Sequence, residues 1–350
     1  MAINLKSIRD QVMVITGASS GIGLATARAA AAKGARLVLA ARNGEVLQGL
    51  ENEINGAGGQ AIHVVADVSR REDVQRIASA AIGRFGGFDT WINNAGVSIY
   101  GRLEEVSLDD QQRLFQVNFW SMVYGSLIAV EHLKHRGGTI INMGSIASDI
   151  VYPLQGMYCA TKHAVRAFTH ALRMELEAEG APVSVTLVKP AGINTPFDHH
   201  AKNYMDKEPK IAPPVYDPQE VAYALLHAAR HPQRVIYVGG GGKMMSSFYK
   251  DAPHLVEWMN ETVMTREQQR QEPPRDREGS LYQARSGGQE RGDYPGHVMK
   301  RSFYTRAKLS PAVKISAFAA LGLVALTLAG IMATDGKPAL PHAVGARKTR

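Results

Sequence analysis

The chain has 350 residues, of which 45% are hydrophobic and 21% are charged, with a net charge of +8 and one Cys. This composition suits a globular core, while a single Cys excludes an internal disulfide framework and makes a reducing compartment the default. Residues 1–250 carry 25 Lys and Arg against 22 Asp and Glu, and residues 251–350 carry 15 against 10. A nucleic-acid-binding face is therefore not indicated in the first part. The excess basic charge lies in the second part, which is interpreted either as a solvated segment or as a segment next to a membrane.

The first 250 residues alternate between short apolar runs, typical of buried parallel strands, and helical patterns. The N-terminus has no apolar run long enough for a secretion signal. The predicted strands are 12–16, 36–41, 61–67, 90–93, 138–143, 183–189 and 234–238, and the predicted helices are 21–33, 45–57, 70–84, 108–134, 157–179 and 218–231. This order predicts an α/β fold, with a single Rossmann-like doubly wound parallel sheet of about seven strands flanked by helices.

The amino-acid composition of the chain changes after residue 250. Residues 265–310 are rich in Gln, Arg, Glu, Gly and Pro, and they offer too little apolar surface to offset chain entropy. We therefore predict a catalytic domain over residues 1–250, followed by a flexible polar linker over residues 251–310. A short helix is expected near 255–269.

An uncharged apolar run follows at residues 315–333, bounded by Lys314 and Asp335. About 20 apolar residues span a bilayer core, so residues 311–334 are predicted to form a transmembrane helix, with a short basic tail over 335–350. A buried core helix and a helix that packs on a partner chain are the alternatives. Slightly more basic residues lie on the N-terminal side of the span, which favours a cytoplasmic location for that side. We therefore predict a membrane protein with a single-pass C-terminal anchor and a catalytic domain that faces the cytoplasm.

A glycine-rich turn follows the first predicted strand. The sequence "VITGASSGIG" places Gly17, Gly21 and Gly23 between that strand and the next helix. A phosphate has to approach backbone N–H groups at the positive helix end, where a side chain would obstruct it. The alternative is that the three glycines serve tight helix–strand packing. Their spacing, Gly-x-x-x-Gly-x-Gly, differs from the common dinucleotide fingerprint.

Further short motifs follow in order: "ADV" at 66–68, "NNAG" at 93–96, Asn118, Ser145 after a strand, and "YCATK" at 158–162. Together with "TGASSGIG" they span most of residues 10–240, and this part resembles the short-chain dehydrogenase/reductase family. The resemblance implies a bound nicotinamide cofactor. The cofactor-binding residues that it implies are Gly17, Ser19, Ser20, Gly21, Ile22, Gly23, Arg42, Asp67, Val68, Asn94, Ala95, Gly96, Tyr158, Lys162, Pro190, Ile193 and Thr195.

The end of the second strand bears on which cofactor is used. An acidic residue there accepts a hydrogen bond from the free ribose 2′-OH of NAD, whereas an Arg accommodates the 2′-phosphate of NADP. The strand ends "LVLAARN", with Arg42 and no acid, and a guanidinium matches a phosphate. We therefore predict NADP(H). A surface Arg is the alternative for Arg42, and Asp67 could equally be a structural residue.

The reacting groups are expected on a strand end and a helix. Tyr158 and Lys162 are four residues apart, so they share one helix face. A carbonyl that accepts hydride also needs a proton, and a nearby ammonium lowers the pKa of a phenol from its usual value near 10. The resemblance implies Tyr158 as general acid and base, Lys162 as its tuning residue, Ser145 as the group that orients substrate, and Asn118 as a support for the proton relay. A polar kink in its helix is the alternative for Asn118.

These features predict an NADP(H)-dependent oxidoreductase that interconverts an alcohol and a ketone or aldehyde. A nucleic acid is not expected as a partner. The predicted anchor suggests a lipophilic substrate, and residues 197–216 are expected to form its lid. The alternative is a membrane-tethered NADP-binding scaffold or sensor without turnover. His63, His199 and His200 form no recognisable metal set. By resemblance, a homodimer or homotetramer is expected through helices 108–134 and 157–179.

Overall fold

The computed structural model of the protein describes residues 3–285 and 287–310. Two compact units divide the chain, Met1–Thr305 and Arg306–Arg350. The last described helix, α11 (Phe303–Leu309), spans the boundary between them. The larger unit contains every residue that the sequence predicts for catalysis or cofactor binding.

The centre of the larger unit is a seven-stranded parallel sheet with the order β11-β7-β6-β4-β1-β2-β3. Its strands are β1 (Val12–Thr16), β2 (Arg36–Ala41), β3 (Gln60–Val65), β4 (Thr90–Asn93), β6 (Gly138–Met143), β7 (Val183–Pro190) and β11 (Val235–Val238). Strands β1, β4, β6 and β7 are buried at every residue, as unalternating apolar runs predict. The order reverses between β1 and β4, where an open α/β sheet leaves a ligand crevice at the carboxyl ends of its strands.

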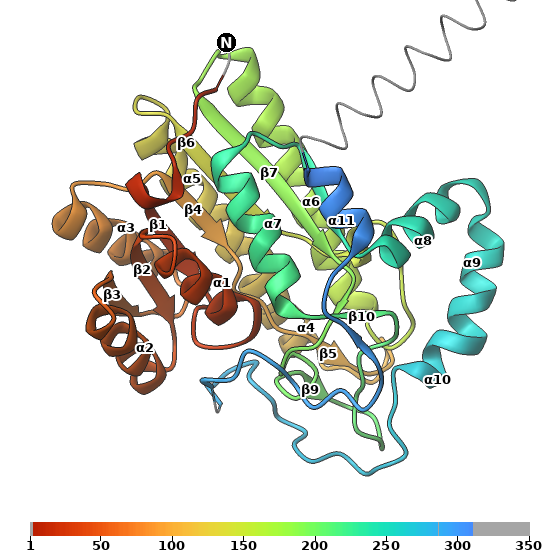
Figure 1. Ribbon diagram of the computed structural model, residues 1–350. Helices are drawn as coiled ribbons and strands as arrows, with labels where there is room; N and C mark the ends of the chain where they lie inside the picture. Colours follow the sequence, from red (N-terminus) through yellow and green to blue (C-terminus); the bar gives the residue numbers. More distant parts are fainter. Residues whose placement is uncertain (1–2, 286, 311–350) are drawn as a thin grey trace, which may run out of the picture. The chain divides into compact units, whose positions relative to one another are not determined.

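Helices cover both faces of this sheet (Figure 1). They are α1 (Gly21–Ala31), α2 (Gly44–Gly56), α3 (Arg71–Phe85), α4 (Leu108–Phe115), α5 (Ser121–Leu133), α6 (Gly156–Ala178) and α7 (Pro218–Arg230). Helices α1 and α7 pack against each other, while α3, α5 and α6 contribute to a separate apolar cluster with the strands. The predicted Rossmann-like sheet is confirmed, and the predicted ends of its strands agree with the observed ones to within two residues.

The helix predicted over 108–134 is not regular throughout. Between α4 and α5 the backbone forms a wider π-type turn at Gln116–Trp120. Asn118 lies inside this turn; its Oδ1 accepts from Val97 N at 2.9 Å, and its Nδ2 donates to Val97 O at 2.9 Å. Turns of this kind are frequent at functional sites. The kink considered for Asn118 is therefore present, and it ties the helix to the chain just after β4.

The region after residue 250 differs from the predicted flexible linker. Helix α8 (Gly240–Asp251) is followed by α9 (Pro253–Met259), a π-type turn at Asn260–Met264 and α10 (Thr265–Glu267). Beyond α10 a long coil runs past the α1 and α2 side and returns to β12 (Val298–Met299), which pairs with β10 (Val215–Tyr216) (Figure 1). Residues 251–285 and 287–305, here called the extension, belong to the larger unit.

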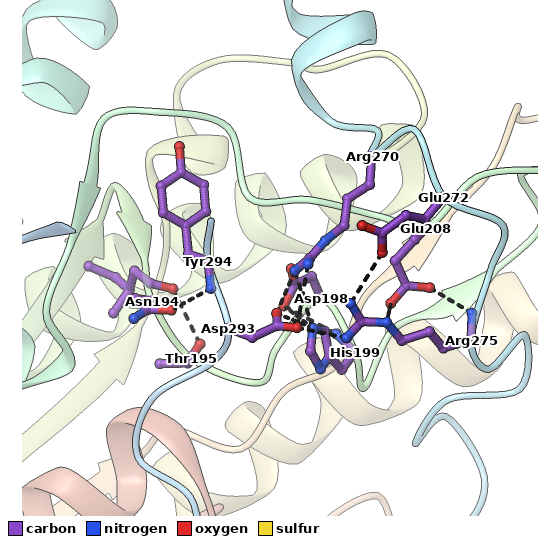
Figure 2. Close-up of polar contacts among 11 residues, drawn as sticks. Asn194, Thr195, Asp198, His199, Glu208, Arg270, Glu272, Arg275, Asp293 and Tyr294 are labelled. Atoms are coloured by element: carbon purple, nitrogen blue, oxygen red, sulfur yellow. Dashed lines mark hydrogen bonds and ion pairs between the residues drawn. The ribbon is translucent and has the colours of Figure 1, made fainter. Parts of the chain in front are cut away.

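Ion pairs explain why such a polar segment is ordered. Residues 197–216, the predicted lid, include the short strands β9 (Lys202–Asn203) and β10. The lid pairs with the extension through His199–Asp293, Lys202–Glu278, Asp206–Arg277, Glu208–Arg275 and Lys210–Glu267. Figure 2 shows Arg270 and Arg275 of the extension reaching toward Asp198, His199 and Glu208 of the lid. The entropy argument failed here because it counted apolar surface alone.

The structure gives no support to a membrane span within the part of the chain that it describes. Among residues 3–285 and 287–310, no helix is both long enough and apolar enough to cross a bilayer. The predicted span at 315–333 and the basic tail at 335–350 lie outside the described residues.

Candidate active site

A cavity of 320 Å³ lies at the carboxyl ends of the parallel strands. Small loop strands border the same end of the sheet, namely β5 (Ile99–Tyr100) paired with β9, and β8 (Gly192–Ile193) paired with β10. The predicted site residues that line the cavity are Gly17, Ser19, Ser20, Gly21, Ile22, Arg42, Asp67, Val68, Asn94, Ala95, Gly96, Ser145, Tyr158, Lys162, Pro190, Ile193 and Thr195. Gly23 and Asn118 lie outside its lining. The structure thus brings together all but two of the residues chosen from the sequence.

The glycine turn between β1 and α1 is closely packed. Gly17 has φ +69°, and a Cβ there would lie 2.8 Å from the Cα of Ala95. A Cβ on Gly23 would lie 2.0 Å from the carbonyl oxygen of Gly17. Asn94 fastens the turn to β4, because its Nδ2 donates to Thr16 O at 2.9 Å. Gly17 and Gly23 therefore serve backbone packing, and this packing places the start of α1 at the cavity wall.

Arg42 and Asp67 line the cavity after β2 and β3, two neighbouring strands at one edge of the sheet. Arg42 is partly buried, and it donates from Nη2 to Ser280 O of the extension at 2.5 Å. Asp67 accepts from Arg113 Nη2 at 2.7 Å and from Ser69 Oγ at 2.7 Å. Burial raises the pKa of the Asp67 carboxyl, but the hydrogen bonds from Arg113 and Ser69 outweigh it and hold the pKa below its usual range. The structural role considered for Asp67 is thus present, alongside its place in the lining.

Ser145, Tyr158 and Lys162 come from two elements. Ser145 follows β6 and begins a short 3₁₀ turn, where its Oγ accepts from Ala147 N at 3.1 Å. Tyr158 and Lys162 lie one turn apart on α6, and the Lys162 Nζ is 5.6 Å from the centroid of the Tyr158 ring. Nζ donates to Met143 O at the end of β6, at 3.0 Å. Strand β6 and helix α6 therefore fix the three groups against one another.

Burial dominates the proton affinities of this group. It raises the pKa of the Tyr158 phenol well above its usual range, although the Ser145 hydroxyl lowers it in part. Burial also lowers the pKa of the Lys162 ammonium to about 8. The expected lowering of the Tyr158 pKa by Lys162 is not what the structure gives, because both groups lose solvation. Near neutral pH the phenol is protonated and Lys162 is largely charged.

Asn118 acts through its neighbours. It is 2% exposed, and its Nδ2 also donates to Thr161 Oγ1 on α6, at 3.3 Å. It therefore joins the loop at Val97 to the helix that carries Tyr158 and Lys162. Its contacts are those of a positioning residue.

Several lining residues were not anticipated from the sequence. The wall near Tyr158 is apolar, and Phe197 of the lid packs edge-on against the Tyr158 ring with centroids 5.7 Å apart. Further members of the lining from the loops, α8 and the extension are Ile146, Tyr152, Ile211, Pro213, Pro214, Met245, Met264, Gln268, Ser280, Ala284 and Arg285. They carry no motif, and only their tertiary placement identifies them.

The lining suits a nicotinamide dinucleotide. Arg42 places a cation in the lining, and the start of α1 borders the same cavity, where a helix N-terminus favours phosphate. Lys162 is 5% exposed, and within the described chain its three N–H donors have one protein acceptor, Met143 O. The remaining donors match ribose hydroxyls. Arg42, the start of α1 and Lys162 would therefore hold the phosphates and the nicotinamide ribose.

Comparison with known proteins agrees with this geometry. A family model described as short chain dehydrogenase matches residues 11–206. An uncharacterized oxidoreductase of Bacillus subtilis, YxnA, is 46% identical over 327 residues, which are 92% of this chain and 91% of that protein. The 11-beta-hydroxysteroid dehydrogenase A of Sesamum indicum is 30% identical and covers 73% of this chain and 75% of its own length. The 3beta-hydroxysteroid dehydrogenase 1 of Eggerthella lenta is 33% identical, with 59% and 78% covered.

Two solved structures share the fold. A short-chain type dehydrogenase/reductase from Mycobacterium marinum aligns with a TM-score of 0.60 at 27% identity, covering 67% of this chain and 96% of that one. An alcohol dehydrogenase from Thermococcus sibiricus, complexed with 5-hydroxy-NADP, aligns with a TM-score of 0.57 at 29% identity, covering 65% and 94%. Both structures match over nearly their whole length and leave part of this chain without a counterpart.

Proposed function

Because the chain belongs to the short-chain dehydrogenase family, we propose that it is an NADP(H)-dependent oxidoreductase that interconverts an alcohol and a ketone or aldehyde. One observation carries the proposal: a single cavity is lined by Arg42, which follows β2, and by Ser145, Tyr158 and Lys162, which come from the end of β6 and from α6. The first residue suits a 2′-phosphate, and the other three suit a carbonyl that gains a hydride and a proton.

The bound nicotinamide supplies the hydride in reduction and accepts it in oxidation. Tyr158 donates its phenolic proton to the substrate oxygen in reduction, and its phenolate removes that proton in oxidation. Ser145 donates a hydrogen bond to the same oxygen and holds it at Tyr158. Since burial keeps Tyr158 protonated at neutral pH, the phenol is there in the form that carbonyl reduction requires.

Lys162 supports the proton transfer by its charge. Its ammonium, present below a pH of about 8, stabilises the Tyr158 phenolate that forms when the proton leaves. Asn118 holds α6 against the loop at Val97 and so keeps Lys162 and Tyr158 in place.

The substrate that we propose is lipophilic. The cavity lining includes Tyr152, Phe197, Met245 and Met264, and Phe197 packs on Tyr158. Apolar walls with a few polar groups are typical of sites for apolar small molecules. Two relatives carry the name hydroxysteroid dehydrogenase, which supports a bulky apolar carbonyl compound or alcohol as the substrate class.

The choice of NADP over NAD depends on the end of β2. Arg42 follows Ala41 there, no acidic residue occupies the position that would bind a free 2′-OH, and the Thermococcus structure is named as a complex with 5-hydroxy-NADP. These observations support NADP(H).

The test follows NADPH consumption with a panel of ketones and aldehydes that includes steroid ketones. We expect the wild type to consume NADPH with at least one of them and Tyr158→Phe to consume almost none while still binding NADPH. Tyr249→Phe is the matched control, because its hydroxyl bonds to Glu257 on the surface, away from the cavity. Equal turnover by wild type and Tyr158→Phe would contradict the assignment, and NADPH binding without turnover on any compound would favour a scaffold or sensor.

A membrane anchor at residues 315–333 remains part of the proposal, supported by the uncharged run in the sequence. Full-length protein should sediment with membranes and require detergent for release, whereas a chain that ends at residue 310 should stay in the supernatant. Full-length protein that remains in the supernatant without detergent would remove the anchor and leave the catalytic proposal intact.

A further inference from the structure

The extension lies directly on the glycine turn of the cavity. We define the strap as residues 279–285 and 287–292. Gly288 N donates to Ser19 O at 2.8 Å, and Gly21 N donates to Gln289 O at 2.8 Å. These reciprocal main-chain bonds join the strap to both sides of the turn at which the phosphates of the cofactor are proposed to bind.

The strap also reaches the end of β2. Arg42 donates from Nη2 to Ser280 O and from Nη1 to Leu281 O, at 2.5 and 3.5 Å. Asn43 Nδ2 donates to Arg285 O at 3.2 Å. The strap therefore forms a wall beside the residue proposed to recognise the 2′-phosphate, and Ser280, Ala284 and Arg285 line the cavity there.

Arg285 brings a second positive charge to this end. Its Nε donates to Gly279 O at 2.9 Å and pairs with Asp276 at 3.3 Å. Among the described residues, both of these partners bind Nε, so the two Nη groups are left for a ligand. Arg42 and Arg285 thus donate to the carbonyl groups of the adjacent residues Ser280 and Gly279, and both line the cavity.

The charges at this end favour an anion. Asp67, which lines the cavity, is already engaged by Arg113 and Ser69. Asp276 offsets part of the charge of Arg285, whereas Arg42 forms no ion pair with a carboxylate among the described residues, so positive charge remains at this end. A phosphate would compensate this charge, because it accepts several hydrogen bonds from each guanidinium. A ribose hydroxyl at the same place would leave this charge uncompensated.

We propose that the strap is part of the cofactor site and that Arg285 binds the 2′-phosphate of NADP together with Arg42. This inference rests on the proposed function, since it needs NADP(H) as the cofactor, and it adds a specificity residue from a segment outside the matched family region, 11–206. The alternative is that Arg285 only stabilises the turn of the strap through Gly279 and Asp276.

The test measures binding without turnover. Dissociation constants are determined by calorimetry for NADPH and NADH, and for the fragments 2′,5′-ADP and ADP, with wild type, Arg285→Gln and Arg285→Lys. We expect Arg285→Gln to raise the dissociation constants of NADPH and 2′,5′-ADP about tenfold or more. The dissociation constants of NADH and ADP should change less than about twofold. Arg285→Lys keeps the charge and should recover part of the loss. Arg277→Gln is the control, because Arg277 pairs with Asp206 on the surface and does not line the cavity.

The outcomes separate this inference from the proposed function. If Arg285→Gln weakens the binding of NADPH and NADH equally, or changes the binding of neither, Arg285 has a structural role or none. The inference is then overturned. If Arg42→Gln weakens NADPH selectively while Arg285→Gln does not, only the inference fails. If the wild type binds NADH as tightly as NADPH, the proposed cofactor itself is wrong. A circular-dichroism melt of each variant excludes misfolding as the cause of a loss.

Discussion

The sheet region and the extension are held together by different interactions. Within the sheet region, β1, β4, β6 and β7 are fully buried, and the largest enclosed side chains include Trp91 and Leu39. Within the described extension, Val256 and Leu281 are the only hydrophobic side chains that are fully enclosed, while polar groups such as Gln268 and Arg270 are buried. The sheet region is therefore stabilised by apolar burial, and the extension by ion pairs and main-chain hydrogen bonds to it.

This difference separates the tasks of the two regions. The sheet region carries the proposed reacting groups, Ser145, Tyr158 and Lys162, on elements whose position depends on the buried core. The extension adds walls to the same cavity and fastens the lid. Ion pairs at a surface contribute little individually and depend on ionic strength, so the walls should be easier to perturb than the reacting groups.

The largest expected effect comes from the reacting group itself. Tyr158→Phe removes the proton donor from the sheet region and should lower kcat by about 10²–10⁴-fold. Protease resistance of the extension should stay as in the wild type, because Phe preserves the ring that packs on Phe197. Steady-state kinetics and a protease time course measure the two readouts. A loss of protease resistance in the extension would show that the two regions are coupled through Tyr158.

A pair of leucine substitutions compares the two regions directly, although Leu281 packs against residues of the sheet region. Leu39→Ala in β2 and Leu281→Ala in the extension each remove a fully buried side chain, at a cost of about 2–5 kcal/mol. We expect Leu39→Ala to lower the free energy of global unfolding, and Leu281→Ala mainly to expose the extension to protease. Urea titration followed by circular dichroism measures the first effect. An equal loss of global stability in both variants would break the comparison, because it would make the extension part of one cooperative unit.

The charge of Lys162 predicts a pH dependence. Its lowered pKa, about 8, means that the ammonium is present below that pH and is lost above it. The kcat/KM for carbonyl reduction should therefore be flat through neutral pH and fall by up to about tenfold per pH unit above 8. Lys162→Arg, which keeps its charge, should be less active but lack this fall. A wild-type profile that stays flat to pH 10 would remove Lys162 from the proton transfer.

Ionic strength should give the smallest effect, and it should act on the extension alone. Raising NaCl from 0.1 to 1 M screens the exposed ion pairs between lid and extension, each worth up to about 1 kcal/mol. Amide hydrogen exchange should become several-fold faster in residues 268–285 and 287–299, with no change in β1, β4 and β6. Equal acceleration in both regions would show that apolar burial does not distinguish them.

Much of the fold and of the site could be predicted because the relevant signals are local. Unalternating apolar runs marked the buried strands, and the glycines after β1 marked a turn that tolerates no side chain. The four-residue interval between Tyr158 and Lys162 placed them on one helix face. The lining residues Met245, Met264 and Arg285 could not be predicted, since no interval or motif connects them to the site. The lowered Tyr158 pKa was also expected in error, because burial cannot be read from two residues on a helix.

The sequence by itself determined the parallel sheet, the turn at its switch point and the residue types that could transfer a proton. The tertiary structure decided that residues 251–285 and 287–305 are a folded part of the same unit and form one wall of its cavity. The physical reason is that apolar periodicity is repeated along one segment, whereas an ion pair such as Arg28–Glu290 or a main-chain bond such as Gly21–Gln289 joins segments that are far apart in the chain. The sequence of either segment alone does not indicate such a partner.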